Sequence, residues 1–257
     1  VKKYAVSKSI PVLQPEKLKA ESFLQTLKSF NATLQIVVAF RMLPEVVWNM
    51  PPLGTINVHG SLLPQYRGAA PINWAIINGE KETGVTTFQL KHEIDTGNIL
   101  LQSKLAIGDD ENCGSVHNRM MKLGAETLAQ TLELLLVNKL TPMPQSAVLP
   151  QNMHHAPKIF TETCLIQWNR NAYDIHNHIR GLSPYPAAIT HLNGKLLKVF
   201  AAKAIVSEHK NAPGQVVTDK KTYLHFSCAN GYIAIEELQL EGKKRMQVIE
   251  FLRGYHW

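Results

Sequence analysis

Two polar side chains in the first half of the chain have the types and spacing needed for catalysis. Residues 55–59 read Thr-Ile-Asn-Val-His, and every second side chain of a strand shares a face, so Asn57 and His59 project together. Gly60 then lets the backbone turn, and Pro64 fixes the backbone angle φ in the short loop that follows the strand. An amide donor beside an imidazole at that position is suited to stabilising a developing oxyanion. An Asn-x-His pair taken alone is more often structural, so a catalytic role needs support from neighbouring residues.

A carboxylate after a second predicted strand extends this pair. Asp95 begins a turn at 95–97, which follows the strand predicted at 84–91. Ligands of open α/β sheets bind at the carboxyl ends of the strands. We therefore expect Asn57, His59 and Asp95 to meet at one edge of a sheet.

Strands and helices alternate around these residues. We predict strands at 11–14, 34–40, 55–59, 84–91 and 98–103, and helices at 15–30, 43–48, 71–78 and 115–137. Gly79 fits the position after the third of these helices. In the last helix, the apolar face is predicted to carry Met121, Ala125, Leu128, Leu132 and Leu135. This alternation predicts an α/β domain with a largely parallel sheet over residues 1–137.

The character of the chain changes in its second half. Prolines punctuate residues 138–158 without apolar periodicity, and we interpret residues 138–167 as a linker. A helix is predicted at 171–182, with Ala172, Ile175, Ile179 and Leu182 on one face. Asn193-Gly194 and Asn230-Gly231 then predict hairpin turns between apolar alternations. Residues 168–257 are therefore expected to form a small antiparallel barrel or sandwich with a leading helix.

Composition indicates a soluble globular protein of one large or two smaller domains. The 257 residues are 45% hydrophobic and 18% charged, and no apolar run approaches the length of a membrane span. Three widely spaced cysteines indicate a reducing compartment and no cysteine-based metal site. Residues 1–136 carry 13 Lys/Arg against 12 Asp/Glu, whereas residues 137–257 carry 14 against 8. The basic second half favours a polyanionic partner, although a merely basic surface is the alternative.

The loop after the first site strand carries a specific resemblance. Residues 57–72 read N-V-H-G-S-L-L-P-Q-Y-R-G-A-A-P-I, which resembles the signature loop of folate-dependent formyltransferases, and Asp95 stands where that family has its catalytic Asp. The R-G-A-A-P-I extension, Ile179-Arg180-Gly181 followed by Pro184-Tyr185-Pro186, and Gly242 to Met246 resemble the family members that formylate methionyl-tRNA. The resemblance covers essentially the whole chain. It implies a Rossmann-like domain followed by an antiparallel β-barrel of the OB type.

The resemblance implies an activity and a catalytic trio. The expected reaction moves a formyl group from 10-formyltetrahydrofolate to the α-amino group of methionine esterified to initiator tRNA, for translation initiation. Asn57 and His59 would stabilise the oxyanion, His59 would pass a proton to the leaving nitrogen, and Asp95 would hold the imidazole or relay a proton. Folate is expected against Phe40, Arg41 and Leu43, and against Ser61, Leu62, Leu63 and Pro64. Phe40 could equally be part of the sheet core.

The basic residues expected to contact tRNA lie in both halves. Arg67 is expected to touch the tRNA or a carboxylate, with capping of its own loop as the alternative. Lys243, Lys244 and Arg245 are expected to contact phosphates, unless they form a solvated turn. The pair His154-His155 has no third ligand at a useful spacing, so no metal is expected.

Other functions use the same scaffold. A formyltransferase acting on a small amine, such as glycinamide ribonucleotide or an amino sugar nucleotide, would use the same trio but has no need of a basic second domain. A formyltetrahydrofolate hydrolase or dehydrogenase module shares that difficulty. A non-catalytic RNA-binding protein on this scaffold is opposed by the intact trio.

Two departures from the family pattern affect these expectations. The family begins with a βαβ unit containing a glycine-rich turn, and the chain begins at Val1 without one, so we expect it to be part of a longer protein. Residues 91–94, Lys-His-Glu-Ile, replace a more acidic, glycine-containing approach to Asp95. We further expect a cytoplasmic bacterial protein that is monomeric and does not bind membranes.

Overall fold

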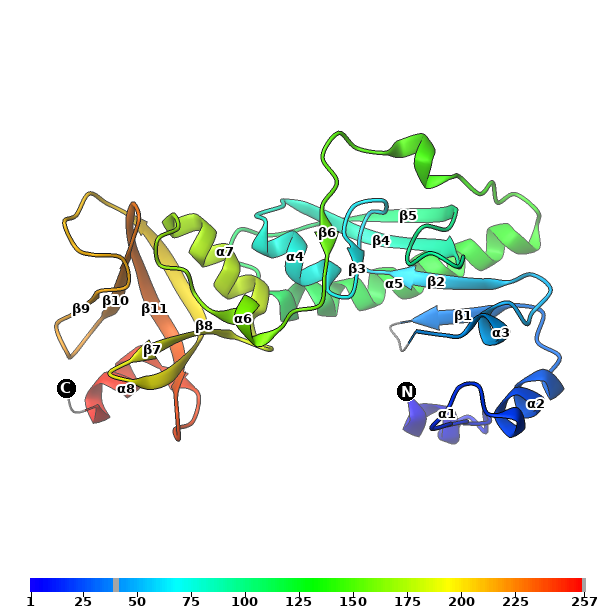
Figure 1. The fold of residues 1–257 in the computed structure, drawn as a ribbon, viewed down its shortest axis with the longest axis horizontal. Helices are drawn as coiled ribbons and strands as arrows, with labels where there is room; N and C mark the ends of the chain where they lie inside the picture. The colour runs from blue at the N-terminus through cyan, green and yellow to red at the C-terminus, as the bar shows by residue number, and fades with distance from the viewer. Residues whose placement is uncertain (39–41, 256–257) are drawn as a thin grey trace.

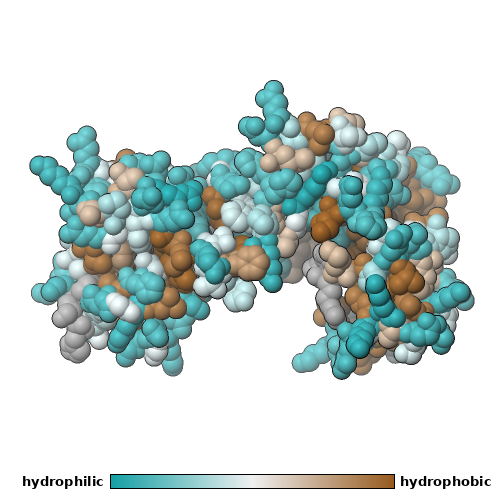
Figure 2. All heavy atoms as spheres, in the orientation of Figure 1, coloured by the Kyte–Doolittle hydropathy of each residue, from teal (hydrophilic) through white to brown (hydrophobic). Residues whose placement is uncertain are grey.

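Two lobes follow one another along the long axis of the molecule (Figure 1). The structure is a computed structural model that describes residues 1–38 and 42–255. The first lobe contains the sheet that carries the candidate site, and the second contains a larger antiparallel sheet. Figure 2 shows a hollow between the two lobes. In the part of the chain described, no helix is long and apolar enough to cross a membrane.

The sheet of the first lobe has four strands in the order β1-β2-β4-β5. They are β1 (Gln35–Val38), β2 (Thr55–His59), β4 (Glu82–Gln89) and β5 (Ile99–Ala106). The α/β class is as predicted, and β1 and β2 pair in parallel. The two remaining pairs among these four strands are antiparallel.

The position of α4 (Pro71–Ile77) explains the antiparallel pairs. This helix lies beyond the end of β2, next to the second lobe, and does not cross back over the sheet (Figure 1). Strand β4 therefore begins beyond the carboxyl end of β2, with Thr86 opposite His59 and Gln89 opposite Ile56. A short connection then returns β5 beside β4, as a hairpin requires.

The remaining helices of the first lobe differ in their agreement with the sequence. They are α1 (Lys2–Ser7), α2 (Glu21–Ser29), α3 (Glu45–Trp48) and α5 (Cys113–Leu136). Residues 11–14 form no strand, and α2 begins six residues later than predicted. Helix α5 covers one face of the sheet, against β4 and β5. It buries Val116, Met120, Gly124, Thr127 and Thr131, so the predicted apolar face was wrong by about one residue and Met121 is exposed.

The segment predicted as a linker contains short ordered elements. These are the 3-10 helix η1 (Gln145–Val148), β6 (His155–Ala156) and α6 (Thr161–Cys164). Strand β6 pairs with β3 (Arg67–Gly68), and Met143 bridges to Ile99 through two backbone hydrogen bonds of 2.8 Å. At Gly68, with φ +127°, a Cβ would stand 2.4 Å from the Ala156 carbonyl oxygen, so only glycine allows this approach. The segment is therefore attached to the loop that follows β2.

The second lobe is an antiparallel sheet with a helix packed against it. Its elements are α7 (Ala172–Leu182), β7 (Ala188–Leu192), β8 (Lys195–Val206), β9 (Val216–Thr218), β10 (Leu224–Cys228), β11 (Gly231–Leu240), β12 (Met246–Gln247) and α8 (Val248–Gly254). The strand order is β7-β8-β11-β10-β9, and β12 pairs with β11. No ladder joins β7 to β9 among the described residues, so the predicted barrel is an open half-barrel.

The predicted apolar face of α7 forms the centre of the second core. Ala172, Ile175, Ile179 and Leu182 are each at most 1% exposed. They pack against apolar side chains of β8 and β11. Both predicted Asn-Gly turns are present, between β7 and β8 and between β10 and β11.

The lobes meet where α4 packs against α7. The Asn73 amide donates to the Gly181 carbonyl oxygen at 2.7 Å. Arg180, 4% exposed, donates from Nη1 to the carbonyl oxygens of Gly108 and Glu111, at 3.2 and 2.9 Å. The motif Ile179-Arg180-Gly181 therefore joins the lobes.

Candidate active site

The Asn57 and His59 side chains share one face of β2, as the strand period predicts. They are 6% and 7% exposed. Val58, between them, packs on the other face with the core under α5. Within the described residues the Asn57 amide has no hydrogen-bond partner, and it lines a cavity of about 240 Å³. Its N–H groups are thus available to a ligand in that cavity.

The imidazole of His59 is oriented by the loop that follows it. Nε2 lies 3.0 Å from the carbonyl oxygen of Tyr66. A carbonyl only accepts, so Nε2 carries a proton and Nδ1 is the nitrogen free to exchange one. Phe88 contacts the ring edge-on, with centroids 6.3 Å apart. The loop after β2 therefore determines that Nδ1 is the imidazole nitrogen left for the site.

The Tyr66 side chain anchors this loop. Its hydroxyl donates to Glu80 Oε1 at 2.6 Å and accepts from the Asn78 amide. Burial, together with the Glu80 carboxylate, raises the pKa of the Tyr66 phenol well above its ordinary value. The phenol is consequently a neutral donor throughout the physiological range.

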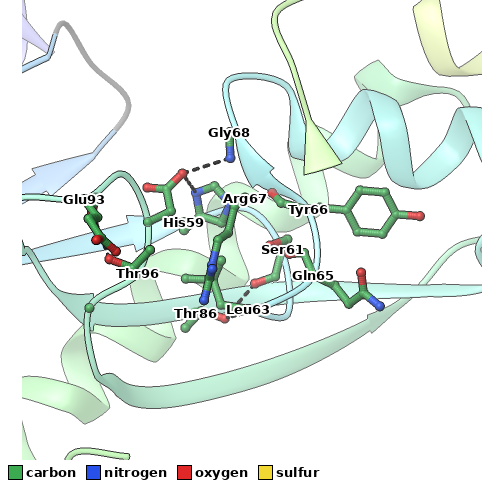
Figure 3. Close-up of polar contacts among 12 residues, drawn as sticks. His59, Ser61, Leu63, Gln65, Tyr66, Arg67, Gly68, Thr86, Glu93 and Thr96 are labelled. Carbon is green, nitrogen blue, oxygen red and sulfur yellow. Dashed lines mark hydrogen bonds and ion pairs between the residues drawn. The ribbon is translucent and has the colours of Figure 1, made fainter. Parts of the chain in front are cut away.

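Asp95 reaches the same place from the connection between β4 and β5. Its Oδ2 accepts the Gly68 N–H at 2.9 Å and lies 3.9 Å from His59 Nδ1 (Figure 3). The second distance is an ion-pair contact, too long for a direct hydrogen bond. Asp95 is 9% exposed and has φ +54°, a conformation uncommon outside glycine, Asn and Asp. The predicted trio is thus brought together at the end of β2.

The 240 Å³ cavity is the natural place for a small ligand beside the trio. Asn57 and Asp95 both contribute to its wall, with mostly apolar neighbours. Among the predicted folate contacts, Leu43 lines it. Phe40 and Arg41 lie outside the described residues. The rest of its lining includes Val37, Trp48, Leu90, His92 and Ile94.

The other predicted folate contacts face into the protein. Ser61 is fully buried and donates to the Gln65 carbonyl oxygen at 2.6 Å, and Leu63 packs with Phe88 and Ile99. Pro64 is also buried and Leu62 is half-buried, and neither lines the cavity. The structure gives these residues a role in fixing the loop, and Figure 3 shows Ser61 and Leu63 beside Thr86.

Gln145 belongs to the site but was not predicted from the sequence. It lies in η1, is 3% exposed, and donates from Nε2 to the carbonyl oxygens of Asp95 and Gly97, each at 2.8 Å. Its Oε1 accepts from Arg67 Nε and Nη2, at 2.9 and 2.5 Å. Arg67, predicted to contact tRNA, thereby binds the joining segment through its Nε and Nη2 groups. The proline-punctuated segment gave no periodic signal for a buried residue.

The basic residues of the β11–β12 turn lie apart from the trio, in the second lobe. Lys243 and Lys244 are exposed. Arg245 makes a two-point contact with the Glu237 carboxylate and lies over the Phe200 ring at 4.2 Å. Only the two lysines therefore present uncommitted charge to a partner. Among the described residues, no three His, Cys, Asp or Glu side chains gather to hold a metal ion.

The fold and the site together define the class of protein. The family model for formyl transferases matches residues 1–132, and the model for the formyl transferase C-terminal domain matches residues 158–256. The chain belongs to the formyl transferase family.

Similarity to individual proteins indicates which members of the family the chain resembles. The chain is 50% identical over 262 residues to the methionyl-tRNA formyltransferase of Bacteroides fragilis, covering 100% of the chain and 81% of that protein. It is 53% identical to that of Parabacteroides distasonis, with 99% and 81% covered.

Solved structures share the fold at lower identity. WlaRD, a sugar 3N-formyl transferase crystallised with dTDP and 5-N-formyl-THF, has a TM-score of 0.69 at 20% identity, covering 95% of this chain and 82% of WlaRD. HypX from Aquifex aeolicus, in complex with tetrahydrofolic acid, has a TM-score of 0.65 at 21% identity, covering 89% of this chain and 40% of HypX.

Proposed function

We propose that the protein transfers the formyl group of 10-formyltetrahydrofolate to the α-amino group of methionyl initiator tRNA. The observation that carries this is the identity of about half of all residues, across both lobes, with methionyl-tRNA formyltransferases. If the acceptor were instead a small amine, the second lobe would have no substrate to bind. The site geometry supports the same reaction.

The reaction is an acyl transfer. The nitrogen of the amino group attacks the formyl carbon and forms a new C–N bond, while negative charge develops on the formyl oxygen. The bond from that carbon to N10 of the folate then breaks, and the proton lost by the amine ends on N10. Free α-amines titrate at about 7.7–8.0, so roughly a tenth to a fifth of the acceptor is already neutral at pH 7. Positioning and oxyanion stabilisation therefore contribute more than a strong base.

Each member of the trio has one role in this scheme. The Asn57 amide, unpaired within the described residues and facing the cavity, donates to the oxyanion. His59 holds Nε2–H on the Tyr66 carbonyl, so Nδ1 carries the proton between the amine and N10. The Asp95 carboxylate, 3.9 Å from Nδ1, stabilises the imidazolium form that arises.

The folate donor is placed in the cavity beside the trio. Its apolar wall, including Leu43, suits the flat ring system, and Asn57 and Asp95 add polar groups to the same lining. In this proposal Ser61, Leu62, Leu63 and Pro64 hold the loop after β2 and do not touch the folate. Phe40 and Arg41 remain predicted contacts. The chemistry proposed for the trio requires no metal.

In this proposal the two lobes have different functions. Residues 1–137 hold folate and perform the chemistry, residues 138–167 join the lobes, and residues 168–257 dock the tRNA. The excess of basic residues after position 137 suits a polyanion, and Lys243 and Lys244 supply exposed positive charge. Arg67 and Arg245, whose guanidinium groups are engaged within the protein, would contribute through their remaining N–H groups. A monomeric, cytoplasmic protein remains our prediction.

Competition among acceptors tests this function. The full natural protein is given 10-formyltetrahydrofolate together with methionyl initiator tRNA, glycinamide ribonucleotide and an amino sugar nucleotide. We expect formylated methionyl-tRNA as the sole product. Transfer to a small amine would retain the trio but overturn the proposed role of the second lobe, and no transfer at all would favour a binding protein.

A further inference from the structure

Gln145 connects two parts of the candidate site. It lies between the two stretches matched by the family models, which end at residue 132 and resume at residue 158. At 3% exposure it is among the most buried polar side chains of the segment that joins the lobes. The Met143–Ile99 bridge, two residues earlier, seats this segment against β5. A buried amide in such a segment must satisfy its hydrogen bonds locally.

The hydrogen bonds of this side chain allow only one orientation. The carbonyl oxygens of Asp95 and Gly97 accept only, so the amide nitrogen must face them, at 2.8 Å each. Arg67 donates only, so the amide oxygen must face its Nε and Nη2. Both donors and both acceptor positions of the amide are therefore used. Among the other side chains, only Asn carries the same amide, and it is one methylene shorter.

The two carbonyls bound by Gln145 bracket the catalytic turn. Asp95 has φ +54°, and such a conformation persists where its surroundings determine it. Gly97 approaches Gln89 so closely that a Cβ would stand 1.6 Å from the Gln89 carbonyl oxygen. The Gly68 N–H fixes Oδ2 of the carboxylate. Gln145 thus holds the backbone of the turn whose side chain faces His59.

We propose that Gln145 is a positioning residue for the formyl transfer reaction, acting through Asp95. The amide sets the backbone of residues 95–97, and this places the Asp95 carboxylate between Gly68 and His59. The proposal rests on the proposed function. It also ties Arg67 to the same turn, so that the loop after β2 and the Asp95 turn keep a common geometry.

Gln145→Glu separates positioning from general packing. The variant keeps the size and the acceptor for Arg67 but removes both donors to the turn. We expect kcat for methionyl-tRNA formylation to fall at least about tenfold, since displacements near 1 Å at a reacting centre carry losses up to about 10²-fold. The KM for methionyl-tRNA should be unchanged. Gln145→Met, which is uncharged and similar in size, is expected to show the same kcat loss and serves if Gln145→Glu does not fold.

The matched control is Gln65→Ala. Gln65 also links the joining segment to the loop, through Asn152 and His154, but touches neither Asp95 nor Arg67. We expect its kcat to be unchanged, even if its stability falls. A loss in Gln65→Ala equal to that in Gln145→Glu would mean general loosening and overturn the proposal.

A double variant tests whether Gln145 acts through Asp95. If it does, Gln145→Glu should lower kcat little further in an Asp95→Asn background. Losses that multiply, or an unchanged kcat in Gln145→Glu alone, would overturn the inference. Wild-type protein that fails to formylate methionyl-tRNA would instead reject the proposed function, so the two failures are distinct.

Discussion

At the scale of single residues, the trio is built from two side chains of β2 and one of the connection between β4 and β5. Asn57 and His59 share a face because they are two apart in β2, as strand periodicity predicts, whereas Asp95 reaches them from the connection between β4 and β5. The orientation of the residues after Gly60 was beyond this reasoning. Ser61 and Leu63 turn inward because the Thr86 hydroxyl donates to the Ser61 carbonyl oxygen and the Leu63 side chain packs with Phe88. Both partners come from β4, about 25 positions away in the sequence.

Asn57→Ala tests the oxyanion role of the amide. Losing one preorganised donor should lower kcat by about 10²–10³ with little change in the KM for 10-formyltetrahydrofolate. Steady-state formylation of methionyl-tRNA, with either substrate varied, measures both constants. A raised KM at constant kcat would show that Asn57 binds the ground state instead.

At the scale of elements, the sequence predicts whether a segment is a helix or a strand better than it predicts which face of the helix is buried. The apolar period of α5 suggested Met121 and Leu128, yet the helix turns Thr127 and Thr131 to the sheet. Their hydroxyls bond Ser103 and Thr87, each at 2.8 Å. A polar contact between a helix and a sheet has no apolar signature, so hydrophobic spacing alone places the face wrongly. The antiparallel direction of β4 likewise has no signature within the strand, because it depends on where α4 packs.

Glu111, just before α5, should give the protein an acid-sensitive contribution to stability. The Gly108 N–H, with Arg119 and Ser115, lowers the pKa of the Glu111 carboxyl from its ordinary value. A lowered folded-state pKa means that the stabilisation is present above the unfolded pKa and is lost as pH falls through the folded one. Glu111→Gln should therefore cost about 1 kcal/mol at pH 7 and progressively less in acid. Urea unfolding at several pH values measures this, and a cost independent of pH would contradict it.

Gly181→Ala tests the packing of α4 on α7. A Cβ at this position would stand 2.6 Å from Ile77 Cγ1 and 3.0 Å from the Ile77 backbone nitrogen. Since that nitrogen cannot move aside easily, we expect a loss of about 1–3 kcal/mol in the free energy of unfolding. Gly194→Ala is not a suitable control because φ there is +77°. Gly254, where nothing lies within 4 Å of a Cβ and φ is not positive, is the better one, and Gly254→Ala should be neutral.

At the scale of the whole molecule, the charge asymmetry of the sequence maps onto the two lobes. The first lobe carries the trio and is nearly neutral, whereas the excess of basic residues lies beyond residue 137. The joining segment was predicted as a featureless linker. Its short elements became visible only in the structure, since β6 depends on β3 and η1 depends on the Asp95 turn.

Lys243→Ala with Lys244→Ala tests the docking role of the second lobe. If both lysines contact phosphates, the KM for tRNA should rise, and the slope of log KM against log salt should fall by about 1 per contact. The KM for 10-formyltetrahydrofolate should not move. Lys203→Ala, at a lysine already paired with Glu236, is the matched control. An unchanged salt slope in the double variant would make this turn a solvated surface.

The most direct test of the account compares His59→Ala with the wild-type protein in two assays on the same samples. Formyl transfer to methionyl initiator tRNA is followed in single turnovers, and tRNA affinity is measured by equilibrium binding. We predict that transfer falls by about 10²–10⁴ while tRNA affinity stays the same, because His59 moves the proton and does not hold the tRNA. Transfer at the wild-type rate in His59→Ala would contradict the central claim that this site performs the chemistry.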